Sequence, residues 1–303
     1  MTTPAPRLQI EPLDGGPRRL HLFSVDVEDY FQVVAFEGVV RREDWDTYPS
    51  RVESNTDRLL DLLAAHSVRG TFFTLGWVAR KHPGLIRRIV DQGHEVASHG
   101  DWHRRVTRMS PQEALEELRN SKAALEDASG QPCFGFRAPS FSIVPGTEWA
   151  FDVLLEAGYR YDSSLFPIRR PDYGYPGVPP APFWIHRPAG SLLELPLATF
   201  GVAGMRLPAA GGGYLRQFPD AFVHRAFREA ERENRPGMFY VHPWEVDPGQ
   251  PRIPCSPLTG IRHYRNIHLM LPRMERLLAE FRFSSVAVEF ARELGQPVRG
   301  AAA

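Results

Sequence analysis

The feature that most constrains the fold is a repeated alternation of short apolar strands and amphipathic helices, six or seven times along the chain. Residues 20–26 and 70–75 are typical strand-like runs, and each precedes a segment whose apolar residues recur at helical spacing. Such alternation builds parallel sheets, because each helix returns the chain to the start of the next strand. No Gly-rich phosphate loop follows any strand, which disfavours a doubly wound open sheet. The sequence therefore predicts an α/β fold, a parallel barrel of seven or eight (β/α) units.

Local residue types predict several boundaries. Residues 50–53 (Ser-Arg-Val-Glu) and 110–113 (Ser-Pro-Gln-Glu) both have capping-box spacing, and the second is expected to start a helix that runs to about Gly130. Residues 167–188 contain too many prolines for regular structure, so we expect a long surface loop there. The run at residues 283–288 is expected to be a last strand.

Composition limits the partners and the compartment. The chain has 303 residues, 43% of them hydrophobic, and equal numbers of basic and acidic residues (36 each), so no net charge would attract nucleic acid. Residues 1–17 have no apolar core of a signal peptide, and no run of about 18 apolar residues would span a membrane. Two cysteines, Cys133 and Cys255, form no disulfide framework, although they are enough for one pair. We expect a soluble, cytoplasmic protein.

The domain organisation is predicted to be simple. We expect residues 1–19 to be a flexible N-terminal tail, residues 20–295 a single barrel domain, and residues 296–303 a second tail.

Polar side chains follow five of the predicted strands at the points where those strands end. The five residues are Asp26, His99, Arg137, Asp162 and His242. In a parallel barrel the carboxyl ends of all strands open on one face, where active sites are built. Each residue alone would suit an ordinary turn or surface position, but the five placements together predict one shared site.

Two histidines four positions apart predict part of a metal site. His99 ends a strand-like run, and Gly100 lets the backbone turn so that His103 faces back toward it. Neutral imidazole nitrogens bind divalent cations at about 2.0–2.1 Å. A carboxylate would complete three protein ligands and leave a position open for water, whose pKa the metal would lower.

The remaining residues of the set suit the hydrolysis of an amide or an ester. A second carboxylate that is not a ligand would act as general base, and a histidine on the opposite wall would protonate the leaving amine. Arg137 would hold the base in its charged form and orient it.

The same residues form five short motifs in a recognisable order. The motifs are Phe23-Ser24-Val25-Asp26-Val27-Glu28-Asp29, Ser98-His99-Gly100-Asp101-Trp102-His103, Arg137-Ala138-Pro139-Ser140, Asp162-Ser163-Ser164 and Val241-His242-Pro243. Together they resemble the NodB-homology polysaccharide deacetylases, carbohydrate esterase family 4, from about Leu20 to Val288. The stretch from Arg262 to Phe283 further resembles the exopolysaccharide-biosynthesis subgroup, often encoded with exosortase systems, which makes about 245–295 a subgroup-specific C-terminal part.

This resemblance implies a distorted (β/α) barrel, a divalent metal that is usually zinc, and removal of N-acetyl groups from a sugar polymer. The implied roles are general base for Asp26, general acid for His242, metal ligand for His99 and His103, tether of the base for Arg137, and orientation of His242 for Asp162.

Two carboxylates are candidates for the third metal ligand. Many members of the family have two adjacent aspartates in the first motif, whereas this chain has Asp26-Val27-Glu28-Asp29. Alternation along a strand places Asp26 and Glu28 on the same side, which favours Glu28, with Asp29 as the alternative. Zinc suits the two histidines, but Co²⁺, Ni²⁺ or Fe²⁺ would accept the same ligands.

Three aromatic residues are predicted to contact the substrate. Trp102 and Trp244 flank His103 and His242, and Phe141 is expected to help wall an acetyl pocket. The alternative for each is buried packing.

The predicted function is metal-dependent removal of N-acetyl groups from an amino-sugar-containing exopolysaccharide or its lipid-linked precursor. One alternative is hydrolysis of a small cyclic amide or a formamide on the same barrel, and another is a non-catalytic, metal-containing glycan-binding protein. The sequence leaves open the glycan, its linkage, the oligomeric state, and any association with the inner membrane through partners.

Overall fold

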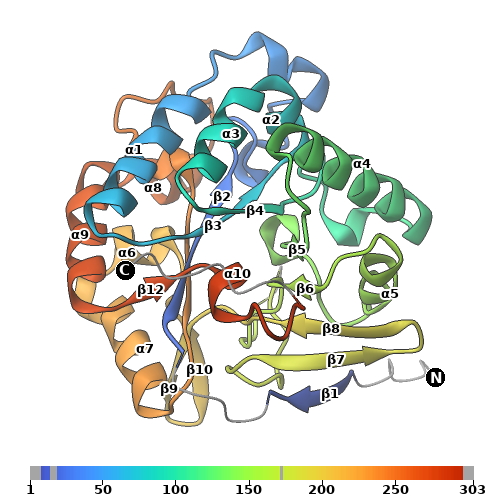
Figure 1. The fold of residues 1–303 in the computed structure, drawn as a ribbon. Helices are drawn as coiled ribbons and strands as arrows, with labels where there is room; N and C mark the ends of the chain where they lie inside the picture. The colour runs from blue at the N-terminus through green and yellow to red at the C-terminus, as the bar shows by residue number, and fades with distance from the viewer. Residues whose placement is uncertain (1–7, 14–18, 171–172, 296–303) are drawn as a thin grey trace.

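The computed structural model describes residues 8–13, 19–170 and 173–295. Figure 1 shows a central barrel of strands with helices packed around its outside. The strands are β1 (Gln9–Pro12), β2 (His21–Val27), β3 (Thr71–Thr74), β4 (Glu95–Ser98), β5 (Gly135–Phe136), β6 (Tyr161–Asp162), β7 (Phe183–Arg187), β8 (Gly190–Glu194), β9 (Thr199–Val202), β10 (Met205–Pro208), β11 (Met238–Val241) and β12 (Phe283–Ser284). The α-helices are α1 (Val52–Ala65), α2 (Gly76–Lys81), α3 (Pro83–Asp91), α4 (Pro111–Ser129), α5 (Trp149–Glu156), α6 (Gly212–Gln217), α7 (Asp220–Arg232), α8 (Pro257–Tyr264), α9 (Met270–Glu280) and α10 (Val286–Glu289).

One sheet contains every strand except the β9–β10 hairpin. Its order is β1-β7-β8-β6-β5-β4-β3-β2-β11, with β12 also paired to the start of β2. The pairs from β8 through β6, β5, β4, β3 and β2 to β11 are all parallel. After β8 the chain continues to Leu197, which bridges Met238 of β11 in parallel, and this bridge closes the barrel. The predicted distorted (β/α) barrel is confirmed, and the open sheet is excluded.

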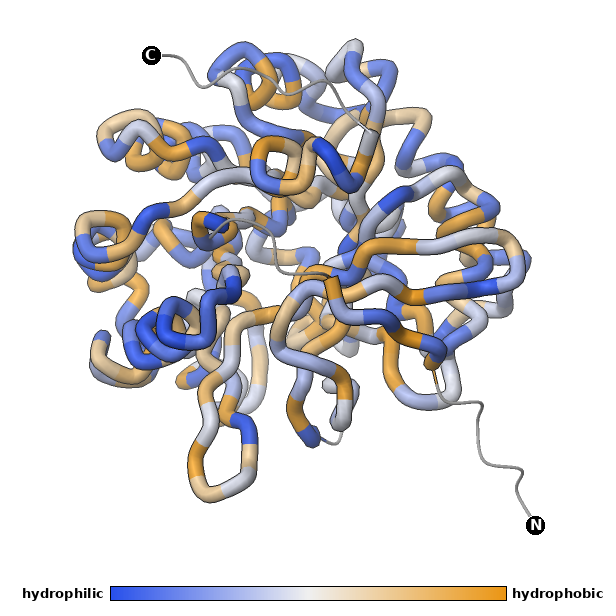
Figure 2. Tube along the Cα trace, turned by 60° about the horizontal axis from the view of Figure 1, so that its bottom comes forward, coloured by the Kyte–Doolittle hydropathy of each residue, from blue (hydrophilic) through white to orange (hydrophobic). Residues whose placement is uncertain are grey.

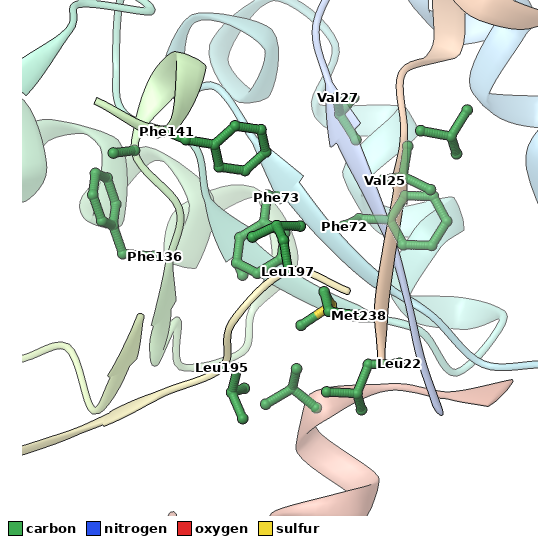
Figure 3. Close-up of a cluster of buried hydrophobic side chains, with 14 of the residues drawn as sticks. Leu22, Val25, Val27, Phe72, Phe73, Phe136, Phe141, Leu195, Leu197 and Met238 are labelled. Carbon is green, nitrogen blue, oxygen red and sulfur yellow. The ribbon is translucent and has the colours of Figure 1, made fainter. Parts of the chain in front are cut away.

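The barrel is filled by apolar side chains from the strands. All seven residues of β2 are buried, which is expected of a parallel strand covered on both faces. Figure 3 shows Val25, Phe72, Phe73, Leu197 and Met238 in one cluster, and each is almost completely buried. Burying a side chain of this size contributes about 1.5–3 kcal/mol relative to leaving it exposed. In Figure 2 blue and orange positions alternate around the outer helices, so each helix has a polar and an apolar face.

The helix predicted from residues 110–113 is confirmed in detail. Ser110 and Glu113 form a reciprocal capping box at the start of α4, and Gly130 ends the helix with a left-handed backbone conformation.

Three predictions, about a tail, a loop and the last strand, are wrong in part. Within the predicted tail, Gln9–Pro12 forms strand β1, because its backbone pairs antiparallel with β7. Within the predicted Pro-rich loop, Phe183–Arg187 forms β7, whose place between β1 and β8 satisfies its backbone on both sides. The last predicted strand ends at Ser284, and helix α10 follows it. Residues 1–7, 14–18 and 296–303 of the predicted tails lie outside the described residues.

Two further findings concern membrane-spanning helices and the cysteines. Within the part of the chain that the structure describes, no helix is long and apolar enough to cross a membrane. Cys133 is buried and Cys255 is exposed, and both are free thiols.

Candidate metal and acid–base site

The predicted site residues come together because their strands are neighbours. Asp26 lies near the end of β2, and His99 and Arg137 directly follow β4 and β5. His242 directly follows β11, which pairs with β2. The parallel strands place all four residues at the same end of the barrel, as predicted.

Three buried side chains could hold a metal ion. Ligand atoms of Glu28, His99 and His103 all lie within 4.8 Å of one another. The loop turns through positive φ at Gly100 (81°) and at His103 (51°), so the two imidazole rings approach to 5.3 Å between centroids. Glu28 Oε2 is buried and lies 2.8 Å from His103 Nε2. A buried carboxylate oxygen beside two imidazoles suits a divalent cation.

His99 is oriented by the backbone of the neighbouring strand. Its Nδ1 lies 2.9 Å from the carbonyl oxygen of Arg137, which can only accept, so Nδ1 carries the proton and Nε2 keeps its lone pair. Burial, together with the nearby charge of His103, lowers the pKa of His99 well below its ordinary value. A neutral imidazole with a free Nε2 is the form that binds metals.

Glu28 is held as a carboxylate. Burial raises its pKa, but the charge and proximity of His103, with His242 and His99, outweigh burial and lower the pKa of Glu28 to about 2. The indole N–H of Trp244 donates to Glu28 Oε1 at 3.2 Å.

Asp29, the alternative ligand, has a structural role instead. Its carboxylate accepts hydrogen bonds from the backbone N–H groups of Arg51 (2.8 Å) and Val52 (3.1 Å), and from the Ser50 hydroxyl (2.7 Å). The backbone N–H of Tyr30 donates to its other oxygen at 2.9 Å. The predicted capping box at residues 50–53 is therefore wrong: no side chain of that segment caps α1, and Asp29 fulfils this role from a distant loop.

Asp26 is paired with a fully buried arginine. Arg137 Nη1 donates to Asp26 Oδ1 at 2.6 Å and to Ser24 Oγ at 2.8 Å. The other guanidinium nitrogens donate to the carbonyl and hydroxyl oxygens of Ser163, and the group lies 4.0 Å from the Phe73 ring centroid. This network supplies the counter-charge that a buried carboxylate needs and fixes its orientation. The predicted contact between Arg137 and Asp26 is confirmed.

His242 faces the two carboxylates but is oriented by a residue that we did not predict. Its Nε2 lies 4.0 Å from Asp26 Oδ2 and 3.7 Å from Glu28 Oε1. Its Nδ1 lies 3.0 Å from Glu245 Oε2, and Arg216 Nε donates to the other oxygen of Glu245 at 2.8 Å. Burial lowers the pKa of His242, but the Glu245 hydrogen bond and the charges of Glu28, Glu245 and Asp26 outweigh it and raise the pKa to about 9.

The predicted contact between Asp162 and His242 is wrong. The Ser164 hydroxyl and backbone N–H donate to the Asp162 carboxyl at 2.6 and 3.2 Å, and Asp162 is also hydrogen-bonded to Glu194, its register partner on β8. Burial raises the pKa of Asp162 to about 6, and burial and the charge of Asp162 raise that of Glu194 well above its ordinary range. Two buried carboxyl groups in contact share a proton, because two adjacent negative charges would be too costly.

Sequence reasoning missed Glu245, Arg216 and Glu194. Only Glu245 had a local indication: the sequence from His242 to Glu245 (His-Pro-Trp-Glu) has Pro at the first position and an acid at the third of a helical turn, as in a capping box. Arg216 and Glu194 reach their partners from distant segments, and no spacing predicts them.

The three aromatic residues differ in exposure. Trp244 is only 6% exposed and stacks with His242 and His263, so the structure places it against the site residues and leaves little ring surface for a sugar. Phe141 is buried against Tyr240 and Phe166, and its place beside an acetyl group stays a prediction. Trp102 is half-buried beside Trp45, and its sugar contact also stays a prediction.

Two family profiles match the chain. Residues 44–161 match the family described as polysaccharide deacetylase. Over these residues the chain is similar to that family. Residues 163–291 match a domain of unknown function, DUF3473, and the two matches meet at β6, in the middle of the sheet.

Curated relatives are similar to this chain over part of its length. A peptidoglycan-N-acetylglucosamine deacetylase from Listeria monocytogenes is 37% identical over 108 residues, 33% of this chain and 23% of the relative. A chitooligosaccharide deacetylase from a Bradyrhizobium species is 36% identical over 124 residues, 41% of this chain and 54% of the relative. The chain thus covers about a quarter to a half of these two relatives.

A solved structure shows the same fold over almost the whole chain. A Mycobacterium smegmatis protein, provisionally described as a polysaccharide deacetylase, superposes with a TM-score of 0.57 at 19% sequence identity. The superposition covers 98% of this chain and 99% of that protein, so the fold extends through the DUF3473 segment.

Proposed function

We propose that this protein is a metal-dependent N-deacetylase that removes acetyl groups from an amino-sugar-containing glycan. The observation that carries the proposal is the arrangement of Asp26 and His242. These two groups face each other 4.0 Å apart beside the Glu28–His99–His103 cluster, at the end of the barrel where the strands terminate.

Glu28, His99 and His103 would hold the cation, for which zinc is the best match to two imidazoles and one carboxylate. When bound, such a cation lowers the pKa of a water molecule and polarises a carbonyl oxygen. This leaves proton transfer and orientation to the residues of the chain.

Asp26 would accept the proton of the attacking water through Oδ2, because Oδ1 is bound to Arg137. His242 would donate a proton from Nε2 to the leaving amine, since Glu245 holds its Nδ1. A pKa of about 9 keeps His242 protonated at neutral pH, as a general acid must be.

The proposal also covers the substrate, the domain structure and the location of the protein. We infer an exopolysaccharide or its lipid-linked precursor from the resemblance of the C-terminal part, and a single domain over residues 20–295. Cytoplasmic location stays a prediction.

Acetate release tests the reaction. Purified protein would be incubated with N-acetylchitohexaose and with a bacterial exopolysaccharide extract, in zinc and after chelation. Asp26→Asn should lower the rate by at least about a hundredfold, because the general base is lost. The matched control is Asp57→Asn on α1, which alters a partly exposed ion pair with Arg88 of α3.

The same assay decides between the alternatives. No acetate from any glycan, with metal bound stoichiometrically, refutes the deacetylase. Opening of small cyclic amides would then favour the first alternative. Unchanged glycan binding in Asp26→Asn and His242→Ala, with no hydrolysis of any substrate, would favour a binding protein.

A further inference from the structure

A surface hollow beside the proposed metal site is lined by four arginines. Its volume is about 520 Å³, and its lining residues are Glu37, Gly38, Arg42, Arg104, Arg105 and Arg108. They come from two segments far apart in the sequence, one preceding α1 and the other preceding α4. The neutral overall composition of the chain gives no indication of such a concentration of one charge.

Positive charge in this hollow exceeds the negative charge that pairs with it. Glu37 accepts from both Arg42 and Arg105 at 2.8 Å, and Arg104 pairs with Glu113 at 2.9 Å. Among the described residues, Arg108 has no ion pair and is exposed. Four guanidinium groups therefore face two carboxylates, which leaves an excess of two positive charges.

Nearby acids do not cancel this excess. Glu117, behind the loop, accepts hydrogen bonds from the backbone N–H groups of Asp101 and Trp102 and is buried. Asp101 pairs with Arg80. Asp101 has its charged partner outside the hollow, whereas Glu117 also interacts with the charge of Arg104. With Glu117 counted, the hollow keeps an excess of at least one positive charge.

The hollow adjoins the loop that carries a proposed metal ligand. Arg42 Nε donates to the carbonyl oxygen of Trp102 at 2.7 Å, and its Nη2 donates to that of His103 at 3.2 Å. Arg104 and Arg105 directly follow His103, so their Cα atoms lie within about 8 Å of the Cα of that ligand. The hollow therefore borders the loop that carries His103.

We propose that this arginine hollow binds an anionic substituent of the glycan, so that the preferred substrate is an acidic N-acetylated glycan. The inference rests on the proposed deacetylase function and names its substrate class. A guanidinium group matches the two oxygens of a carboxylate or of a phosphate, and its charge is permanent. The shared chemistry is an oxyanion, carried by a uronic acid or by a phosphate ester.

The variants for the test are chosen to spare the metal loop. Arg42 holds the backbone of that loop, so Arg104→Ala/Arg108→Ala is the informative change. The matched control is Arg119→Ala on α4, which removes an exposed arginine that pairs with Glu156 of α5 and lies outside the hollow.

Binding would be measured by calorimetry with three probes: a hyaluronan hexasaccharide, which carries carboxylates, inorganic pyrophosphate, and neutral N-acetylchitohexaose. The double variant should bind at least one of the two anions about tenfold more weakly, with chitohexaose affinity and the control unchanged. If only the affinity for hyaluronan falls, the anionic group of the glycan is a carboxylate. If only the affinity for pyrophosphate falls, it is a phosphate ester. Equal anion affinity in wild type and double variant overturns the proposal, as does failure of both anions to bind.

Acetate release separates this inference from the proposed function. If the deacetylase function and the arginine hollow are both correct, the double variant raises KM for the hyaluronan hexasaccharide about tenfold and leaves kcat for it unchanged. KM and kcat for chitohexaose should then equal those of the wild type. Arginine-dependent anion binding without acetate from any glycan refutes the deacetylase and leaves an anion site. Acetate released from both glycans with the same constants in wild type and double variant retains the deacetylase and refutes the arginine hollow.

Discussion

Two adjacent carboxylates, Glu28 and Asp29, should respond to neutralisation in opposite ways. Glu28 lies with the two histidines and makes one hydrogen bond to Trp244, whereas Asp29 accepts four hydrogen bonds and belongs to no metal cluster among the described residues. The matched variants are Glu28→Gln and Asp29→Asn, each of which removes one charge and retains the size of the side chain.

Asp29→Asn should destabilise the fold. The amide has no charge and keeps one acceptor oxygen, so all three donors at the start of α1 lose a charged partner. Either these three donors or the Tyr30 N–H also lose their acceptor, depending on the orientation of the amide. Losing such a cap costs about 0.5–2 kcal/mol, and a buried donor left unpaired costs about 1–3 kcal/mol. A total of about 3 kcal/mol lowers Tm by about 5 °C for a chain of 303 residues. Metal content should remain stoichiometric.

Glu28→Gln should lose metal and keep its stability. Metal affinity should fall by more than about a hundredfold, because an amide oxygen is a poor ligand and one of three is lost. Tm of the metal-free protein should stay within about 2 °C, since glutamine can still accept from Trp244 and a buried charge is removed. Calorimetric melting with metal analysis measures both quantities. Metal lost in Asp29→Asn and retained in Glu28→Gln would refute the assignment.

Three further changes test other contacts. Glu245→Gln should lower kcat roughly tenfold to a hundredfold with little change in KM, because His242 loses its charged orienting partner; steady-state kinetics that show an unchanged kcat would contradict this. Glu194 has a pKa raised by burial, so the folded state binds more protons than the unfolded chain and stability falls as pH rises above the ordinary carboxyl range. Melting curves between about pH 5 and pH 9 should therefore have a shallower pH dependence in Glu194→Gln than in wild type, and equal slopes would contradict the shared proton with Asp162. Gly76→Ala should lower Tm, because a Cβ there would lie 2.9 Å from the backbone of α4 and 2.1 Å from a carboxylate; a melt like that of wild type would show that the backbone yields.

The sequence predicted the parts of the site that follow from backbone geometry. Residues at the ends of adjacent parallel strands must be neighbours, so Asp26, His99, Arg137 and His242 converge once the strands are recognised. The choice of side-chain partner is different, because it depends on packing between distant segments. Asp29 reaches the start of α1 rather than the metal site for this reason.

The orientation of His242, the proposed general acid, illustrates the limit. Asp162 ends a strand as predicted, but its neighbour across the sheet is Glu194, and the two buried carboxyl groups satisfy each other. His242 therefore takes its partner from its own turn, where Glu245 lies three residues on and Arg216 neutralises it. A local pair holds the acid without help from the opposite wall of the barrel.

The distribution of the site along the chain bears on its domain structure. Asp26 and Glu28 precede both matched segments, His99 and Arg137 lie in the polysaccharide deacetylase match, and His242 lies in the DUF3473 match. Residues 163–291 also supply β8 and β11, whose connection through Leu197 closes the barrel. A chain cut after β6 would lose the proposed general acid His242, the Glu245–Arg216 pair that orients it, and one wall of the barrel. Because neither segment contains a complete site or a complete barrel, we infer that the two matches divide one folding unit rather than two domains.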